Sequence, residues 1–486
     1  MSSTERRIAA AAWLLIIALC LVRFLHFTAD FPNHSPWQMD QAKFTDEGFW
    51  ASAAINHHLT GHWITAGDYN PAAALPVWPA LLGLLFHFTG ISIIATRALN
   101  VTLSIATLAA VYTLLRRYAA TQTTATLAVI LLAASPFAYA FSRLATLETL
   151  VIFEFALLLL TASCVSTKRL WPWIILPLLI TATALTKTTA IALLPAVYWL
   201  VASRLNWNPG AIFRAAIGIV VLPALLVKEH ATLIATLGYH NDYRYFFDEN
   251  GMPDIVWKQS LHTLLTLLRN SLWIDRILAP LLVVILIAAL THKRSLWRNP
   301  LFTASWIALA GQSAFLFSRQ DDFAPRYFLA MLLPTVLIVA IALDAFTTQT
   351  ARALLLTCAA ASVALNIATT GFFIHHRDEA LYSAGNRIRD IVTHDPTQPK
   401  LILGISSEEL SLFTGIPSLN DTFGTADLDT KIARYHPGWY LGWTGLPREY
   451  AVAFAPFRVE EVARFHLFDD PERDTLILYK LAPRDP

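Results

Sequence analysis

Eleven long apolar runs follow one another along this chain and limit the folds that it can adopt. They lie at about 8–27, 92–115, 123–141, 147–165, 171–185, 188–203, 211–227, 276–291, 300–317, 325–343 and 352–374. Most approach the ~20 residues that a helix needs to cross ~30 Å of hydrocarbon. Charged residues make up only 14% of the 486 residues, whereas a soluble protein typically carries about 25%. The sequence therefore predicts an all-α polytopic membrane protein with about eleven transmembrane helices.

Basic residues between the runs predict the orientation, because cytoplasmic loops are enriched in Lys and Arg. They occur at Arg6/Arg7, Arg116/Arg117, Lys168/Arg169, Arg204, His292–Arg294 with Arg298, and Arg352. A further apolar run at 73–90 contains Pro76, Pro79 and His87. If it spanned the membrane, every later basic loop would move outside, so we expect a juxtamembrane helix there. The prediction is a multi-pass protein of the cell (inner) membrane with a cytoplasmic N-terminus.

This orientation divides the chain into two predicted domains. Residues 1–374 form the transmembrane domain, with outer loops at 28–91 and 228–275, and residues 375–486 form a polar tail. In the tail, short β runs such as LILGI (401–405) and TLILYK (475–480) alternate with helical patches such as SSEELSLF (406–413); YAVAF (450–454) belongs to the same alternating pattern. That alternation predicts a small extracytoplasmic α/β domain.

Two acidic segments lie on the predicted outer face. Asp46 and Glu47 precede the helical pattern of FTDEGFWASAA; they either stabilise the first turn of that helix or place a general base near an acceptor proton. Glu148, in AFSRLATLETL, lies at the outer end of a span. An ionisable residue there usually faces a cavity or a partner. A surface ion pair with Arg143 is the structural alternative.

Two cationic segments lie on the same predicted face. Lys187 occupies a short turn in TALTKTTA, and Arg326 follows Pro325 at the mouth of a span. A guanidinium binds phosphate through two parallel hydrogen bonds. The alternatives are snorkelling of Lys187 to water and, for Arg326, an interfacial anchor with Tyr327 or an ion network with the preceding turn.

Several function classes are excluded by what the sequence lacks. There is no GxGxxG after a strand, no Walker A segment and no CxxC pair, so nucleotide chemistry is unsupported. A net charge of +2 gives no reason to expect nucleic acid as a partner. A transporter or flippase for a lipid-linked or amphiphilic solute stays open, because intramembrane charges also mark transport pathways. The sequence shows no inverted repeat of the kind that transporters commonly carry.

Four motifs occur in order over roughly residues 40–345: TDEGFWASAA with the following GHW, SRLATLET, TALTKTTAIALLP and PRYFLAMLLP. Together they resemble the C-type polytopic membrane glycosyltransferases, in the branch of protein O-mannosyltransferases and lipid A aminoarabinose transferases. The resemblance implies a hexosyl or pentosyl transferase. Its donor would be a polyprenyl-phosphate sugar, and its acceptor a lipid, glycan or protein on the outer face of the membrane.

The resemblance also implies residue roles. Asp46 would be the catalytic base, supported by Glu47, and Glu148 the second acid, while Lys187 and Arg326 would contact the donor phosphate. No cofactor is certain, and a divalent metal ion held by Asp46 and Glu148 stays open. The family's Lys-Pro-Pro-Leu segment is replaced here by DYNPAAALPVWP, in which Asp68 is the candidate substitute.

The second outer loop adds further candidate substrate contacts. GYHNDYRYFFDENG contains His240, Asp242, Arg244 and Tyr245, and the stretch IVWKQSLHTLLTLLRN that follows has an approximate helical apolar stripe. The stripe predicts an amphipathic helix in the interface, either covering a substrate cavity or serving as a structural surface helix. The remaining candidate substrate contacts are Arg143, Asp68 and Tyr327.

Overall fold

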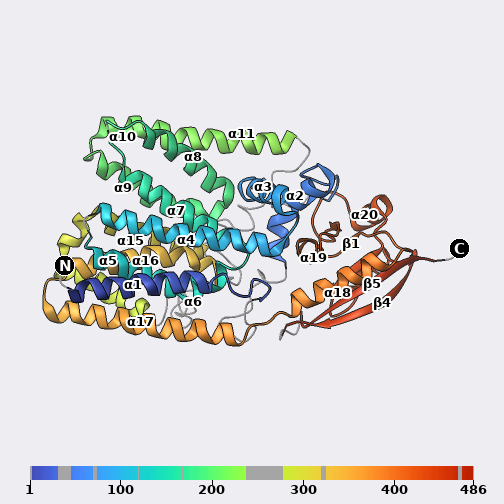
Figure 1. Cartoon of the computed structure of the whole chain (residues 1–486). Coiled ribbons are helices and arrows are strands. Elements are labelled where there is room, and N and C mark those ends of the chain that lie inside the picture. Colours follow the sequence, from blue (N-terminus) through green and yellow to red (C-terminus); the bar gives the residue numbers. More distant parts are fainter. Residues whose placement is uncertain are drawn as a thin grey trace.

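The computed structural model (Figure 1) describes residues 3–30, 45–68, 70, 74–118, 120–166, 168–236, 277–318, 325–468 and 473–484. Within them, each of the eleven apolar runs forms helix. The bounds are α1 (Ser3–Val22), α4 (Ile93–Arg117), α5 (Gln122–Ala134) with α6 (Pro136–Phe141), α7 (Leu147–Ser163), α8 (Trp171–Thr186), η3 (Thr188–Leu193) with α9 (Leu194–Arg204), α10 (Pro209–Ala216) with η4 (Ile217–Val221) and α11 (Leu222–Thr236), α14 (Leu278–Thr291), η6 (Arg294–Arg298) with α15 (Pro300–Ser318), η7 (Pro325–Phe328) with α16 (Leu329–Ala345), and α17 (Gln349–His375).

Local sequence explains why the run at 123–141 forms two helices rather than one. Pro136 has no N–H group and disfavours the helical conformation of the residue before it. Ser135 accordingly has a non-helical backbone (φ −58°, ψ 120°), and its hydroxyl caps α6 by accepting a hydrogen bond from the Ala138 amide at 3.2 Å. The chain therefore restarts as a short helix, and the segment from 142 to 146 then leads into α7.

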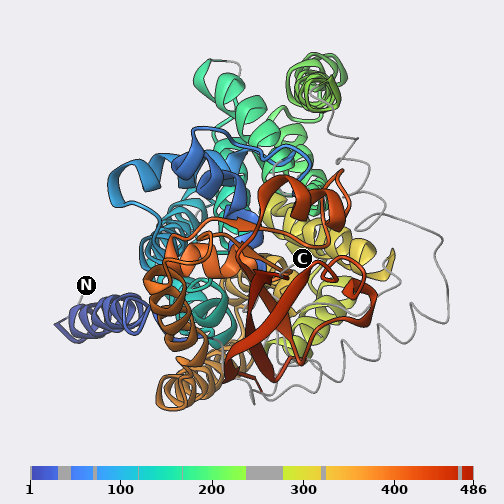
Figure 2. The same cartoon turned by 90° about the vertical axis from the view of Figure 1, so that its right-hand side faces the viewer.

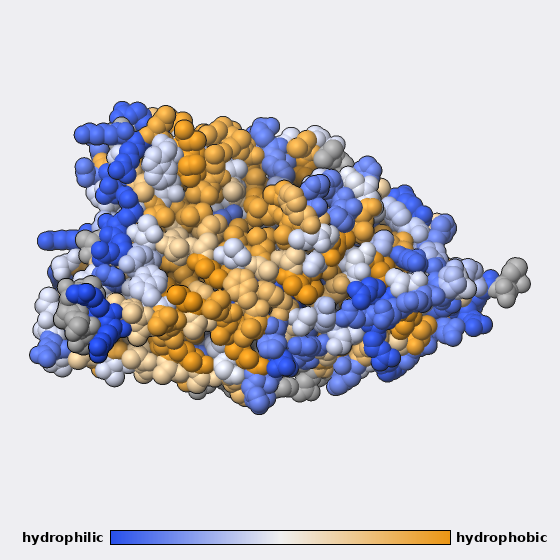
Figure 3. All heavy atoms as spheres, in the orientation of Figure 1, coloured by the Kyte–Doolittle hydropathy of each residue, from blue (hydrophilic) through white to orange (hydrophobic). Residues whose placement is uncertain are grey.

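The outer surface of the helical part is apolar. Large exposed side chains include Leu14 and Ile17 on α1, Phe213 on α10, Val283 on α14 and Leu354 on α17. On the face that Figure 3 shows, a hydrophobic band covers the helical part between a hydrophilic edge and the mostly hydrophilic C-terminal domain. Exposed apolar surface on this scale marks contact with lipid or with another protein.

The lengths of the helices also indicate a membrane protein. Among the described residues, four helical segments are by themselves long and apolar enough to cross a membrane, at Ile93–Arg117, Pro209–Thr236, Arg326–Ala345 and Gln349–His375. Five shorter apolar helices accompany them. Helix α16 is buried along most of its length and packs against α5, α7 and α15. The chain is a multi-pass membrane protein.

Two further helices lie at the end of the bundle that faces the C-terminal domain (Figure 1): α2 (Asp46–Thr60) and α3 (Val77–Thr89). They pack against each other through an apolar cluster that includes Trp50, Trp78 and Phe86. Helix α3 falls within the run at 73–90, and its 13 residues rise only about 20 Å. That length suits the predicted juxtamembrane helix better than a span.

The C-terminal domain contains a five-stranded mixed sheet covered by short helices. Its strand order is β2-β1-β3-β5-β4, with parallel pairs β1–β2 and β1–β3 and antiparallel pairs β3–β5 and β4–β5. Figure 2 shows this domain lying over the end of the helical bundle. The bounds are α18 (Ala380–His394), β1 (Ile402–Leu403), α19 (Ser407–Thr414), β2 (Ser418–Leu419), α20 (Leu428–Tyr435), β3 (Trp439–Trp443), η8 (Arg448–Tyr450), β4 (Phe457–His466) and β5 (Thr475–Pro483).

The predicted fold class, an all-α polytopic membrane protein with a small C-terminal α/β domain, is confirmed. YAVAF at 450–454 is not a strand: Tyr450 ends η8, residues 451–454 form turns, and Phe454 packs into the core beside Tyr440. The predicted amphipathic helix at 255–270 lies outside the described residues. The extracytoplasmic position of the domain stays a prediction.

Candidate active site

Four of the predicted site residues meet at the end of the bundle beside the C-terminal domain. Asp46 is the first residue of α2, Glu148 lies in the first turn of α7, Lys187 follows the last residue of α8, and Arg326 lies in η7. We call these four residues the charge cluster. Arg326 Nη2 lies 2.7 Å from Asp46 Oδ2, and Arg326 Nε lies 3.6 Å from Glu148 Oε1. Lys187 Nζ forms a buried ion pair with the same Glu148 oxygen.

The ring of Tyr327 completes this arrangement. Lys187 Nζ lies 4.7 Å from the ring centroid, and Arg326 Cζ lies 5.2 Å from it. Both distances are within the range of cation–π attraction. The Tyr327 carbonyl accepts a hydrogen bond from Gln312 at 3.0 Å. The aromatic residue after Arg326 therefore holds both cations on one side of the cluster.

Helix ends place these side chains. Lys187 has an extended backbone (φ −157°, ψ 126°) between α8 and η3, so its side chain projects from a break between two helices towards Glu148. Glu148 lies in the first turn of α7, where the helix dipole favours negative charge. Arg326 occupies the single 3₁₀ turn that begins at Pro325, and proline is preorganised for a helix start.

The cluster borders a pocket lined by Glu148, Lys187, Gln312, Arg326 and Tyr327 together with apolar side chains. Only 6–9% of the Glu148, Lys187 and Arg326 side chains is exposed, and 13% of Asp46. Buried charges are tolerated when they are paired, and here two carboxylates balance two cations. Of the described atoms, none donates a hydrogen bond to Glu148 Oε2, which is also buried. The pocket is therefore lined by two cationic donors and by a carboxylate whose Oε2 accepts no bond from the described residues.

Glu47 lies elsewhere, although it is adjacent to Asp46 in sequence. Its buried carboxylate accepts from Arg97 at 2.5 and 2.9 Å and from the Ala145 amide at 2.6 Å. Arg97 also donates to Asp30 at 3.1 Å. The expected direct support of Asp46 by Glu47 has no counterpart in these contacts. Glu47 instead connects α2 to α4 and to the segment that leads into Glu148.

Arg143 and Asp68 are also outside the cluster. Arg143 donates to the Tyr139 hydroxyl at 3.0 Å and to the carbonyls of Leu25 and His26. The alternative Glu148–Arg143 ion pair is therefore wrong, since Glu148 pairs with Lys187 and Arg326.

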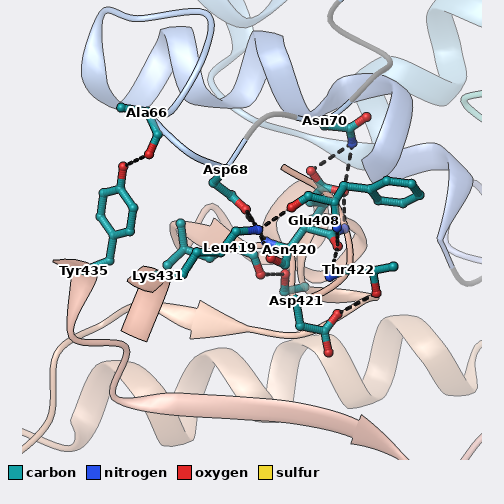
Figure 4. Close-up of polar contacts among 12 residues, drawn as sticks. Ala66, Asp68, Asn70, Glu408, Leu419, Asn420, Asp421, Thr422, Lys431 and Tyr435 are labelled. Atoms are coloured by element: carbon teal, nitrogen blue, oxygen red, sulfur yellow. Dashed lines mark hydrogen bonds and ion pairs between the residues drawn. The ribbon is translucent and has the colours of Figure 1, made fainter. Parts of the chain in front are cut away.

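Asp68 contacts the C-terminal domain. Its carboxylate lies 2.6 Å from Lys431 Nζ and accepts from the Asn420 amide at 3.2 Å (Figure 4). Burial raises the pKa of Asp68 above its ordinary value, against the opposing effect of Lys431. Asp68 therefore has a docking contact where the sequence led us to expect a substrate contact. His240, Asp242, Arg244 and Tyr245 lie outside the described residues.

The donor set does not fit a metal ion. Asp46 and Glu148 supply carboxylates, but Arg326 and Lys187 already neutralise them. A divalent ion held by these two carboxylates would have to displace both cations, and the described residues contain no group of three His, Cys, Asp or Glu side chains able to hold one. We assign no step to a metal.

Sequence reasoning missed two residues that support the cluster. Arg97, fully buried, holds Glu47 and Asp30 together. Its signal was present, because an arginine inside an apolar run is costly unless it has partners. Glu409 of α19 accepts from the Gly48 amide at 2.6 Å. Nothing in the local sequence connects positions 48 and 409, so only the folded chain reveals that contact.

Comparisons with known proteins agree with this architecture. Residues 71–227 match the family model described as dolichyl-phosphate-mannose-protein mannosyltransferase. No curated protein sequence matches the chain.

Two solved structures of ArnT from Cupriavidus metallidurans are similar over almost the whole chain. The apo form has a TM-score of 0.66 and the form bound to undecaprenyl phosphate 0.65, each at 15% identity and covering 97% of this chain and 98% of theirs. The apo oligosaccharyltransferase of Archaeoglobus fulgidus has a TM-score of 0.50 at 11% identity, covering 96% of this chain and 76% of its own. The fold that the motif resemblance implies is confirmed: the chain shares the fold of the two ArnT structures over almost its whole length.

Proposed function

We propose that this protein transfers a sugar from a polyprenyl-phosphate-linked donor to an acceptor at the membrane face that carries the C-terminal domain. The observation that carries the proposal is the charge cluster, in which two buried cations lie beside two carboxylates. ArnT, which shares the fold, has been solved with undecaprenyl phosphate, and the matching family model is described by a dolichyl-phosphate sugar. We further propose that the sugar is a hexose or pentose, that the acceptor is a lipid, glycan or protein, and that the site lies on the extracytoplasmic face of the inner membrane.

The chemistry needs an anion site and a proton acceptor within one small space. A hydroxyl or amine of the acceptor attacks the anomeric carbon and forms the new glycosidic bond. The bond between that carbon and the phosphate oxygen breaks, and its electron pair leaves with the polyprenyl phosphate. Fixed cations favour this step because negative charge grows on the departing oxygen. Arg326 and Lys187 have the charge and the burial for that role.

Asp46 is the proposed proton acceptor. In the structure one of its oxygens accepts from Arg326 at 2.7 Å. A donor phosphate bound to Arg326 competes with the carboxylate for the same N–H groups. Arrival of the donor therefore releases Asp46 from the guanidinium and leaves it beside the acceptor, where a general base must lie. The proton that the acceptor loses goes to Asp46.

Glu148 has a different proposed role. Its Oε1 pairs with Lys187 and lies near Arg326, so it keeps both cations in place, while its Oε2 accepts nothing from the described residues. We assign that oxygen to a hydroxyl group of the transferred sugar. In this proposal Asp46 accepts the proton, and Glu148 holds the two cations in position.

Binding of undecaprenyl phosphate tests the anion site without knowledge of the sugar. We expect it to raise the thermal midpoint of the purified protein, with undecaprenol, which lacks phosphate, giving a smaller shift. Arg326→Gln should remove the difference between the two lipids. Equal shifts in the wild-type protein would contradict the proposal.

Transfer is tested with donor lipids extracted from the native membrane. Reconstituted wild-type protein should release free polyprenyl phosphate, detected by mass spectrometry, and Asp46→Asn should not. A flippase would instead move the intact donor lipid across the vesicle without releasing polyprenyl phosphate. That result would overturn the transferase proposal.

A further inference from the structure

In the first turn of α2, a backbone amide donates a hydrogen bond to a side chain from the C-terminal domain. With Asp46 as the first helical residue, Gly48 is the third, and its amide is one of the donors that have no partner inside a helix. A capping side chain just before the helix usually accepts from this position. Here the acceptor is Glu409 Oε2 of α19, at 2.6 Å and buried from solvent. The C-terminal domain therefore caps the helix that begins with Asp46.

The two helices approach unusually closely at this point. A Cβ atom on Gly48 would lie only 2.1 Å from the Glu409 backbone nitrogen and 2.2 Å from the Glu408 carbonyl carbon. Glycine is required at position 48 because any side chain would push α19 away. The hydrogen bond from the Gly48 amide and the absence of a Cβ atom at Gly48 are thus two independent features of the contact between α2 and α19.

Further contacts join the outer loop around α2 to the C-terminal domain. Glu408 accepts from Asn70 at 2.9 and 3.0 Å and from Asn420 at 3.1 Å (Figure 4). The Phe49 and Phe423 rings meet edge to face with centroids 5.4 Å apart. The Ala426 amide donates to the Gly67 carbonyl at 3.0 Å. The start of α2 is therefore held in position by α19 and by the loop after β2.

The position of Asp46 depends on this contact. Asp46 lies two residues before Gly48, and its carboxylate must meet Arg326 from another part of the chain. Displacements of about 1 Å in a reacting group cost roughly 10²-fold in rate. We propose that Glu409 is a positioning residue for the glycosyl transfer proposed above: by capping α2 it fixes the Asp46 carboxylate opposite Arg326. The assignment rests on the proposed function.

Two variants of nearly equal size isolate the hydrogen bond. Glu409→Gln keeps an acceptor oxygen, whereas Glu409→Met has a side chain of similar length without one. We expect Glu409→Gln to transfer sugar at close to the wild-type rate. Glu409→Met should lower kcat by about tenfold or more, with little change in the binding of undecaprenyl phosphate, because the cations are untouched. Glu461→Met, at an exposed position on β4, is the surface control and should behave as wild type.

Hydrogen exchange gives a readout that does not depend on activity. The peptide that covers the first turn of α2 should exchange slowly in the wild-type protein and in Glu409→Gln, and faster in Glu409→Met. If Glu409→Met yields no folded protein, Glu409→Ala removes the acceptor without adding an apolar group. Rapid exchange of this peptide in the wild-type protein would overturn the assignment without any variant.

The outcomes separate the two proposals. If wild type is active, Asp46→Asn is inactive, and Glu409→Met matches Glu409→Gln in kcat, the positioning role is wrong and the proposed function stands. A lower yield or melting temperature with unchanged kcat in the folded fraction would also overturn the positioning role. If wild type releases no polyprenyl phosphate, the proposed function fails and the assignment fails with it.

Discussion

Arg326 donates to the Asp46 carboxylate at 2.7 Å, which joins the candidate phosphate ligand to the candidate base. The two residues come from η7 and α2, and α19 of the C-terminal domain holds the start of α2 through Gly48. A donor phosphate and Asp46 therefore compete for one guanidinium. Experiments can therefore separate the two residues. Loss of the Asp46 carboxylate should tighten lipid binding while it stops turnover, whereas loss of the Arg326 guanidinium should weaken lipid binding.

Asp46→Asn should abolish transfer and tighten the binding of undecaprenyl phosphate. The amide cannot accept the proton of the acceptor, and loss of a general base typically costs about 10²–10⁴-fold in rate. It also carries no charge, so Arg326 loses the closer of its two carboxylate partners and binds phosphate more tightly. Turnover and a lipid titration on the same preparation measure both effects. Weaker lipid binding in Asp46→Asn would contradict the competition.

Arg326→Lys should weaken donor use although it conserves charge. A lysine ammonium cannot form the two parallel hydrogen bonds of a guanidinium, so an exchange at a bidentate site is not conservative. We expect the KM for donor to rise and kcat/KM to fall by about tenfold, with a larger fall in Arg326→Gln. Arg458→Lys, at an exposed ion pair on β4, is the matched control. Equal kinetics for Arg326→Lys and wild type would remove Arg326 from phosphate binding.

The helical part of this fold was predictable because lipid leaves few alternatives for a backbone. Every N–H and C=O group in hydrocarbon needs an internal partner, so a long apolar run must become helix. Strand β4 was not predicted because its sequence FRVEEVARFH is polar at half of its ten positions, without a regular alternation. The strand is at the edge of the sheet and pairs only with β5, so most of its side chains face solvent. Its hydropathy therefore resembles that of a loop.

The sequence predicted which charged residues belong to the site better than it predicted which of them form ion pairs with one another. Four motifs marked four of its charged residues, but a sequence does not say which neighbours they meet. Asp46 and Glu47 illustrate the limit. Consecutive residues on a helix point about 100° apart, so only one of the two can face Arg326, while the other faces Arg97. Which of them does so depends on how α2 packs against α4 and α19.

Arg97→Met should destabilise the protein more than any surface change. Arg97 is fully buried between Glu47 and Asp30, and removing one partner from a buried ion pair typically costs about 3–5 kcal/mol, because the remaining charge has no compensation. The burial of Asp30 already raises its pKa to about 7, which shows the cost of charge at this position. Thermal unfolding in detergent measures the loss. Arg458→Met serves as the exposed control, and a similar midpoint for both variants would contradict the structural role.

The contact between the C-terminal domain and the outer loop should weaken as pH rises. Burial raises the pKa of Glu408 to about 8 from an ordinary 4.5, against the hydrogen bonds from Asn70 and Asn420. The folded protein then keeps a proton that the unfolded chain loses above pH 4.5. Stability is therefore fully present below pH 4.5 and is lost as pH rises towards about 8.

Glu408→Gln cannot ionise and tests this directly. One proton bound only in the folded state contributes at most about 1.4 kcal/mol per pH unit. Wild type should lose thermal stability between about pH 5 and about pH 8, and Glu408→Gln should lose less over the same interval. Some slope should remain, because burial also raises the pKa of Asp68 and of Glu409 at the same contact. Glu461→Gln, exposed on β4, should follow wild type. Parallel pH profiles for wild type and Glu408→Gln would show that Glu408 ionises equally in the folded and unfolded chain.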